Sequence, residues 1–186
     1  MAHVTLILGG ARSGKSALAE RLAQDSGLAV TYIATAQAGD AEMAARIAHH
    51  RARRPAHWRL VEAPLALAST LAREADTHTL LLVDCLTLWL TNLLCQAQPP
   101  DDAGLAALSA ELADQLAQLP GEVLLVSNEV GLGVVPMGAL SRRFVDEAGR
   151  LNQALAARAQ RVAFVAAGLP LWLKGTAPSA FGVAHE

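Results

Sequence analysis

The stretch VTLILGGARSGKS, residues 4–16, decides the fold. Its largely apolar first part is typical of a strand buried on both faces. The glycine-rich part that follows matches G-x-x-x-x-G-K-[ST] and leads into a helical pattern, which is the context that this phosphate-binding loop requires. Its backbone N–H groups and the helix N-terminus favour a bound phosphate. We therefore predict a nucleotide site made of Gly9, Gly10, Ala11, Arg12, Ser13, Gly14, Lys15 and Ser16. We expect Lys15 to reach the β- and γ-phosphates and the Ser16 hydroxyl to hold Mg²⁺.

Apolar runs of the same kind recur along the chain and alternate with helical patterns. The predicted strands are 4–8, 29–34, 79–84, 122–127 and 161–168. The predicted helices are 15–26, 40–54, 64–75, 86–97, 101–119 and 139–159, with Asp40, Asp101 and Asp102 placed to start two of them. This alternation predicts a doubly wound α/β fold with a mostly parallel sheet. We expect residues 1–174 to form one domain and 175–186 a C-terminal tail.

Composition narrows the class of protein. The 186 residues are 53% hydrophobic and 17% charged, which suits one well-packed domain. A net charge of -2 gives no general attraction to nucleic acid. Cys85 and Cys95 lack metal-ligand spacing and are expected to be packed, reduced thiols of a cytoplasmic protein. The apolar span 79–95 contains Asp84, so we expect a strand and a helix there and no transmembrane segment.

Polar residues follow two of the predicted strands. Asp84 ends the strand 79–84, where an acid can hold the metal, directly or through water; it could also cap the helix that follows. The loop SNEVGLGVVP, residues 127–136, should reach the same sheet edge. Its Glu129 fits a ligand for metal or substrate and a simple turn residue equally well.

A charged helix face is expected further along the chain, made of Arg142, Arg143, Asp146 and Arg150. Such a pattern is typical of a salt-linked helix face and less often of a partner or substrate face. The three tryptophans are expected in the core.

Two adjacent histidines lie in RIAHHRARRP, residues 46–55. On a helix, His49 would lie one turn from Arg46 and from Arg53, while His50 would share a more apolar face with Ile47. Flanking guanidinium groups disfavour a protonated imidazole and hold phosphates, which suits a nucleophile. Taken alone, the segment fits a solvated basic helix end that stops at Pro55 better than a nucleophile.

Taken together, seven segments closely resemble the bifunctional adenosylcobinamide kinase/adenosylcobinamide-phosphate guanylyltransferase family. They are GGARSGKS, YIATA, DAEMAARIAHHRARRPAHW, VEAP, VDCLTLWLTNLL, VSNEVGLGVVP and RRFVDEAGRLNQALA. The resemblance runs in order from about residue 5 to residue 174. The phosphate loop occurs in many families, whereas the histidine segment and the SNEVGLGVVP loop make the resemblance specific.

The resemblance implies an enzyme of late adenosylcobalamin assembly with a fold like that of the recombinase-type P-loop ATPases. Such an enzyme phosphorylates adenosylcobinamide with ATP or GTP and then transfers GMP from GTP to that phosphate through a GMP-histidine intermediate, here on His49. It also implies a homotrimer with sites between subunits. The family's nucleotide contacts correspond here to the phosphate loop and to Ala34, Thr35, Ala36, His50, Arg51, Ala52, Arg53, Glu62 and Asp84. Some relatives carry Glu at the position of Asp84, and the shorter side chain leaves direct metal contact open.

Two other functions remain compatible with the residues alone. An ordinary P-loop small-molecule kinase would use the histidines only as helix residues near the phosphates, and GTP would leave no nucleotide bound to the protein. A nucleotide-dependent switch is disfavoured by the absence of an N-K-x-D tetrad. Labelling with GTP distinguishes the bifunctional enzyme from the first alternative, and turnover of a corrinoid distinguishes it from the second.

Overall fold

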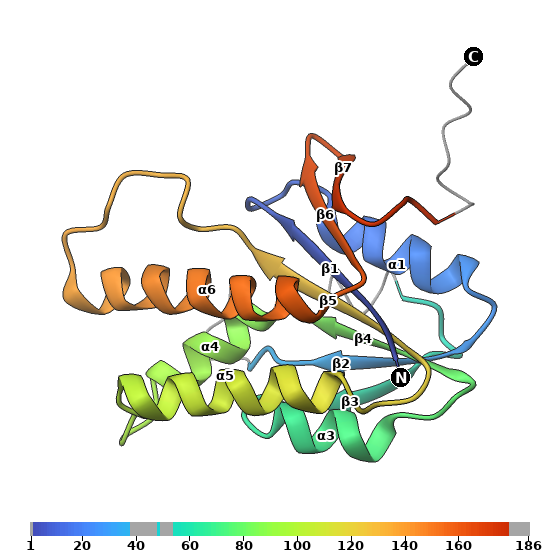
Figure 1. The fold of residues 1–186 in the computed structure, drawn as a ribbon, viewed down its shortest axis with the longest axis horizontal. Helices are drawn as coiled ribbons and strands as arrows, with labels where there is room; N and C mark the ends of the chain where they lie inside the picture. Colours follow the sequence, from blue (N-terminus) through green and yellow to red (C-terminus); the bar gives the residue numbers. More distant parts are fainter. Residues whose placement is uncertain (1, 38–47, 49–53, 179–186) are drawn as a thin grey trace.

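A seven-stranded sheet forms the centre of the computed structural model, which describes residues 2–37, 48 and 54–178 (Figure 1). The strands are β1 (His3–Gly9), β2 (Ala29–Ala34), β3 (Arg59–Glu62), β4 (Thr79–Asp84), β5 (Glu122–Asn128), β6 (Arg161–Ala166) and β7 (Leu169–Lys174). Their order is β3-β2-β4-β5-β1-β6-β7. All neighbours pair in parallel except β6 and β7, which are antiparallel. The predicted α/β fold with a mostly parallel sheet is confirmed.

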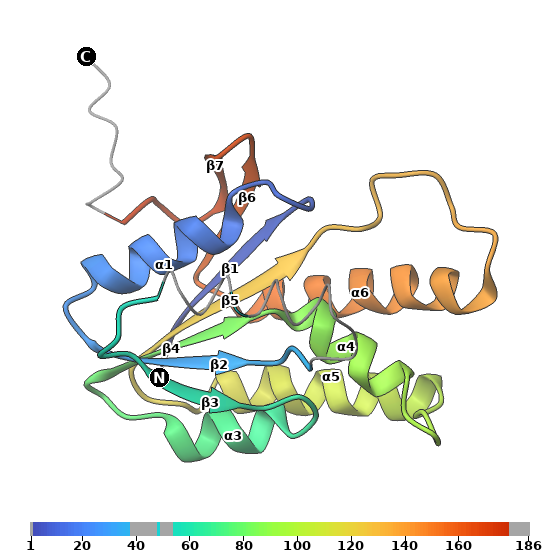
Figure 2. The same ribbon diagram turned by 180° about the vertical axis from the view of Figure 1, so that it is seen from behind.

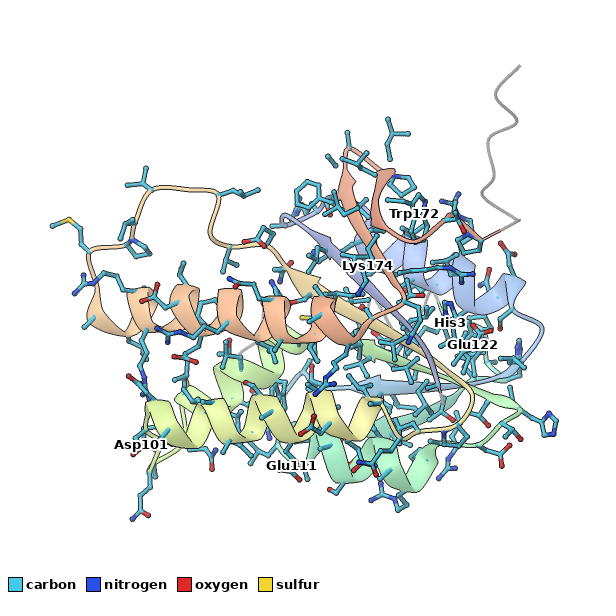
Figure 3. The ribbon with its side chains drawn as sticks, in the orientation of Figure 1. His3, Asp101, Glu111, Glu122, Trp172 and Lys174 are labelled. Atoms are coloured by element: carbon cyan, nitrogen blue, oxygen red, sulfur yellow. The ribbon has the colours of Figure 1, made fainter. Side chains whose placement is uncertain are left out.

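Helices cover both faces of the sheet (Figures 1 and 2). They are α1 (Lys15–Asp25), α3 (Leu67–Glu74), α4 (Leu86–Leu94), α5 (Asp102–Leu116) and α6 (Ala139–Arg158). The first helix packs on one face, and the other four pack on the opposite face. Asp101 caps α5, because its side chain accepts a hydrogen bond of 2.8 Å from the backbone N–H of Gly104. The predicted start of this helix is therefore confirmed (Figure 3).

The side chains of successive strand residues pack into two separate cores. In β1, Leu6 belongs to the core under α3–α6, whereas Ile7 belongs to the core under α1. In β4, Leu81 and Leu82 divide in the same way. Because both faces are buried, these strands need apolar residues at every position, which explains the continuous runs in the sequence. Two tryptophans are buried in the core, and Trp172 of β7 packs partly buried against the α1 side (Figure 3), as predicted.

Two strands were not predicted from the sequence. β3 has only two partly buried apolar residues, so it lacks the signal of a central strand. The predicted strand 161–168 ends at Ala166, and the chain then reverses into β7 through Ala167 and Gly168, whose φ angles are 51° and 80°. Positive φ at both loop residues is the geometry of a two-residue hairpin, and an alanine there is not a usual sequence signal for it.

The predicted helices 40–54 and 86–97 and the apolar span 79–95 can be compared with the structure. The predicted helix 40–54, with Asp40, lies outside the described residues apart from positions 48 and 54. The predicted helix 86–97 ends at Leu94, so Cys95 follows the last turn and is exposed; the expectation that it is packed is wrong. Both cysteines are free. The span 79–95 forms β4 and α4 as expected, and none of the described helices is long and apolar enough to cross a membrane.

Candidate nucleotide and metal site

The residues predicted from separate motifs meet at one edge of the sheet. Register pairing aligns Ala34, at the end of β2, with Glu62 on one side and with Asp84 on the other. Two strands further along the same edge, Gly9 ends β1 opposite Asn128 of β5. The carboxyl ends of parallel strands are where ligands bind in this fold class. The parallel register therefore brings the phosphate loop and the acidic strand end together.

The phosphate loop connects β1 to α1 through a compact backbone. Arg12 and Gly14 have positive φ angles of 56° and 98°. The N–H of Ser13 donates to the carbonyl of Gly10 at 3.3 Å, and the N–H of Leu18 donates to that of Gly14 at 2.9 Å. Ala11 and Arg12 are exposed, whereas the Ser13 hydroxyl is buried and has no hydrogen-bond partner among the described residues. The loop thus leaves a buried polar group available to a ligand oxygen.

The β6–β7 hairpin contacts the phosphate loop. The N–H of Gly168 donates to the carbonyl of Ser13 at 2.8 Å. A Cβ atom on Gly14 would lie 2.9 Å from the Cα of Gly168, so a larger residue at this position would collide with the hairpin. Gly14 is therefore required twice, for its positive φ and for this close approach. The sequence pattern does not reveal this role of Gly168, because the predicted strand 161–168 includes it.

Lys15 is the first residue of α1, and its exposed fraction is only 8%. Its Nζ donates to the carbonyl of Gly10 at 3.0 Å, so the side chain folds back along the phosphate loop. Burial lowers the pKa of this amine, and the nearby Asp84 and Cys85 act in the opposite direction. The lysine charge is thus held in a partly desolvated position beside the loop, where a phosphate group would interact strongly with it.

Asp84 is held by an aromatic residue of the neighbouring strand. The hydroxyl of Tyr32 donates to Oδ2 of Asp84 at 3.1 Å. Leu86 begins the helix that follows, with Cys85 as its N-cap and no side-chain cap. The alternative interpretation of Asp84 as a helix cap is therefore wrong. Oδ1 of Asp84 has no hydrogen bond among the described residues, which leaves one carboxylate oxygen available to a cation or to water.

The donor set suits Mg²⁺ better than a metal that needs a protein cage. The part of the chain that the structure describes contains no group of three or more His, Cys, Asp or Glu residues able to hold a metal ion. Mg²⁺ is usually bound by one or two protein oxygens together with waters and substrate phosphates. The half-buried Ser16 hydroxyl and the carboxylate of Asp84 match that requirement.

Thr35 supports the site from inside the protein. Its side chain is fully buried, and its hydroxyl accepts from the N–H of Cys85 at 2.9 Å and donates to the carbonyl of Cys85 at 2.7 Å. The Thr35 carbonyl accepts a bond of 2.7 Å from the Asn92 side chain. The hydroxyl therefore ties the end of β2 to the residue after Asp84. Ala34 and Ala36 are only partly buried, and Glu62 is exposed at the end of β3.

The loop after β5 begins beside the phosphate loop. The N–H of Glu129 donates to the carbonyl of Gly9 at 3.0 Å, while the Glu129 side chain accepts from the N–H of Gly131 at 3.0 Å. The second bond supports the turn interpretation of this carboxylate. Further along, Leu132, Val134, Val135 and Met137 are strongly exposed. This apolar loop, residues 129–138, runs alongside α6, above that helix in Figure 1.

The arginines of α6 mainly hold neighbouring parts of the chain. Arg143 forms an ion pair of 2.9 Å with Asp102 and donates to the carbonyl of Pro100 at 2.7 Å. Arg142 donates to the carbonyls of Pro136 and Met137. Arg150 pairs with Glu147 one turn earlier. The expected salt links are confirmed for Arg143 and Arg150, whereas the bonds of Arg142 go to backbone carbonyls.

Five predicted site residues lie outside the described residues. They are His49, His50, Arg51, Ala52 and Arg53. Arg54 is the next residue that the structure describes, and its guanidinium carbon lies 3.9 Å from the centroid of the Tyr32 ring. Tyr32 was missed in the sequence analysis. Its strand position could have identified it, because residues two apart on a strand share a face and Tyr32 comes two before the predicted contact Ala34.

A phosphate loop at the carboxyl edge of a parallel sheet, with an acid at the end of a neighbouring strand, defines a P-loop nucleotide-binding protein. Two solved structures have a similar fold. A Pyrococcus horikoshii OT3 protein from a structural project has a TM-score of 0.58 at 8% identity, covering 94% of this chain and 87% of that one. A solved ATPase domain has a TM-score of 0.50 at 16% identity, covering 87% of this chain and 68% of that one. These similarities support the fold class alone.

The sequence comparisons identify the family. Residues 5–173 match the model of the cobinamide kinase / cobinamide phosphate guanyltransferase family. The chain is 66% identical to the bifunctional adenosylcobalamin biosynthesis protein CobP of Pseudomonas aeruginosa, covering 91% of this chain and 96% of that one. It is 45% identical to CobU of Escherichia coli K12, covering 91% and 98%. The chain therefore belongs to the cobinamide kinase / cobinamide phosphate guanyltransferase family, and it is an enzyme of adenosylcobalamin biosynthesis with both activities.

The Thr35 network predicts the effect of Thr35→Val. The substitution keeps the shape of the side chain but leaves the buried N–H and carbonyl of Cys85 without this partner. We expect a loss of about 1–3 kcal/mol in the free energy of unfolding, measured by urea denaturation. Thr31→Val is a matched control, because Thr31 is a buried threonine of β2, the strand that ends just before Thr35, and lies outside this network. Equal stability of the Thr35→Val and Thr31→Val proteins would contradict the assigned role.

Proposed function

We propose that this chain carries out both reactions at the edge formed by the ends of β1, β2, β3 and β4. In the first reaction, a hydroxyl of adenosylcobinamide attacks the γ-phosphorus of ATP or GTP, which releases the nucleoside diphosphate. In the second, GMP passes from GTP to the new phosphate, which releases pyrophosphate and gives adenosylcobinamide-GDP. The observation that carries this proposal is the alignment of the phosphate loop with Ala34, Glu62 and Asp84 at one sheet edge, in a chain of this family.

For phosphoryl transfer, positioning and charge stabilisation supply most of the catalysis. We assign the β- and γ-phosphates to the backbone of residues 9–16 and to Lys15. The buried Ser13 hydroxyl, which lacks a partner among the described residues, is a further donor for a phosphate oxygen. We assign Ser16 and Asp84 to Mg²⁺, which when bound neutralises charge on the phosphates. Ala34, Thr35, Ala36 and Glu62 then lie along the path of the nucleotide, with Thr35 contributing through its backbone or through the neighbours it holds.

Lys15→Ala tests the kinase assignment. Loss of the ammonium group next to the γ-phosphate should lower the kinase kcat severely, on the order of a hundredfold or more, since electrostatic groups of this kind supply several kcal/mol. The measurement is transfer of γ-labelled phosphate to adenosylcobinamide at saturating nucleotide. Lys174→Ala is the control, because the Lys174 ammonium group donates to the carbonyls of Ala156 and Ala157, at the end of α6. An unchanged rate in Lys15→Ala would overturn the assignment.

For guanylyl transfer, we propose a covalent step on His49. A neutral imidazole nitrogen attacks the α-phosphorus of GTP, the bond to the β,γ-pyrophosphate breaks, and a GMP-histidine phosphoramidate forms. The phosphate of adenosylcobinamide phosphate then attacks the same phosphorus and frees the imidazole. This role rests on the resemblance and on the sequence setting between Arg46 and Arg53, while His50, Arg51, Ala52 and Arg53 are assigned to binding the nucleotide.

Labelling with α-labelled GTP and Mg²⁺ tests this step. We expect label on the denatured wild-type protein that survives mild base and is lost in acid, as a phosphoramidate is. His49→Ala should lose the label and guanylyl transfer while keeping the kinase reaction, whose groups are Lys15, Ser16 and Asp84. The neighbouring variant His50→Ala is the control and should keep at least part of the label. Label that persists in His49→Ala, or that maps to His50, would contradict the assignment.

We further propose a homotrimer in the cytoplasm. The family resemblance supports the trimer, and two exposed apolar surfaces supply area for subunit contacts: the apolar loop 129–138 and Leu169, Leu171 and Leu173 of the edge strand β7. Apolar patches of this kind and unpaired strand edges are typical of interaction sites. The two free cysteines suit a reducing compartment.

Light scattering at micromolar concentration tests the assembly. We expect a mass three times that of the chain, because a trimer would cover the exposed leucines and valines of these surfaces. Leu171→Glu together with Val134→Glu should shift the mass toward the monomer, since charges disfavour an apolar contact. A stable monomer in the wild-type protein would overturn the trimer.

A further inference from the structure

Tyr32 is placed to act on the acidic strand end. It lies on β2 opposite Leu82 of β4, so Asp84, two residues further along β4, is its diagonal neighbour on the same face of the sheet. Diagonal neighbours lie within reach of an aromatic side chain. The Tyr32 hydroxyl uses this reach to donate to Oδ2 of Asp84 at 3.1 Å. The register of β2 and β4 thus builds the contact, and no loop is involved in it.

The ring of Tyr32 is buried in the core and contacts a guanidinium group. It is only 4% exposed and belongs to the α1-side core together with Trp58 and Leu82. The Arg54 guanidinium carbon lies 3.9 Å from the ring centroid, which is a stacking distance for a cation on an aromatic face. A ring fixed in this way has little freedom to swing its hydroxyl away from the carboxylate. The bond to Oδ2 therefore fixes the rotation of the Asp84 carboxylate and leaves Oδ1 for another partner.

The Tyr32 hydroxyl is the donor in its bond to Asp84. A protonated phenol can only donate to an ionised carboxylate, so the direction of the bond is set. Groups that orient a metal-binding side chain in this way typically change metal affinity or activity by about 10–100-fold when they are removed.

We propose that Tyr32 is a positioning residue for Asp84, and that its hydroxyl orients the carboxylate for the Mg²⁺ that accompanies the bound nucleotide. This inference rests on the proposed role of Asp84. It predicts that Tyr32 affects only the part of nucleotide binding that depends on Mg²⁺. Binding without the metal depends on the phosphate loop and Lys15, and the hydrogen bond of the Tyr32 hydroxyl goes to Asp84 and not to either of these.

Tyr32→Phe tests the proposal, because phenylalanine keeps the ring and its contact with Arg54 and removes only the hydroxyl. The measurement is ATP affinity by calorimetry, first in excess EDTA and then across a Mg²⁺ titration. We expect an unchanged affinity in EDTA and a Mg²⁺ concentration for half-maximal enhancement that rises about tenfold or more. Thr31→Val, which removes a buried hydroxyl from the adjacent position of β2, should behave as wild type. Thermal unfolding of each variant checks that the fold is retained.

A double-mutant cycle separates positioning from a general structural effect. If Tyr32 acts through Asp84, then Tyr32→Phe should cause no further loss in an Asp84→Asn background. Additive losses, an unchanged Mg²⁺ dependence in Tyr32→Phe, or a parallel loss of affinity in EDTA would each overturn the inference. Failure of the wild-type protein to phosphorylate adenosylcobinamide would overturn the proposed function instead, because the binding measurements contain no corrinoid.

Discussion

The parallel register of the sheet is the constraint on which the site depends. Strands β3, β2 and β4 end in step, so Glu62, Ala34 and Asp84 occupy one row, and β1 delivers Gly9 to the same edge. A shift by one residue in β4 would turn Asp84 to the opposite face and away from Tyr32 and α1. In the observed register, Leu81 and Leu82 pack into opposite cores, and Asp84 lies on the same face of the sheet as Leu82 and Tyr32.

Around that edge, backbone contacts join segments that are far apart in the sequence. Thr35 bonds both polar groups of Cys85, Glu129 bonds the carbonyl of Gly9, and Gly168 bonds the carbonyl of Ser13. Each bond satisfies a backbone group at a strand end, where the sheet ladder stops. The bonds of Glu129 and Gly168 join two backbone groups, so they depend on local conformation more than on residue type, whereas the Thr35 bonds require its hydroxyl. This explains why a turn residue such as Gly168 supports the phosphate loop although no motif contains it.

The strands could be predicted from the sequence wherever burial of both faces required a continuous run of apolar residues. The middle residues of strands such as β4 and β5 are all apolar because helices cover both sides, and the glycine loop reveals the order of strand and helix. β3 and β7 are the two edge strands, and there the requirement is weaker, so their sequences lack that pattern. The role of Asp84 as a metal ligand could be proposed from its position alone, and the strand pattern places Tyr32 on the face of Ala34, whereas the contact between Tyr32 and Asp84 follows only from cross-strand register.

Lys15 and Asp84 are charged groups at the edge where a ligand with several negative charges is proposed to bind. Burial lowers the lysine pKa, and the carboxylate nearby opposes that shift. The ammonium group donates to the carbonyl of Gly10, which partly compensates for its desolvation. An incoming phosphate would give the lysine a stronger, charged acceptor, and a metal ion would give Asp84 a charged partner in the same way. In the proposed site, a nucleotide and its metal would give Lys15 and Asp84 new charged partners, and the bond from the Tyr32 hydroxyl would hold the carboxylate during that exchange.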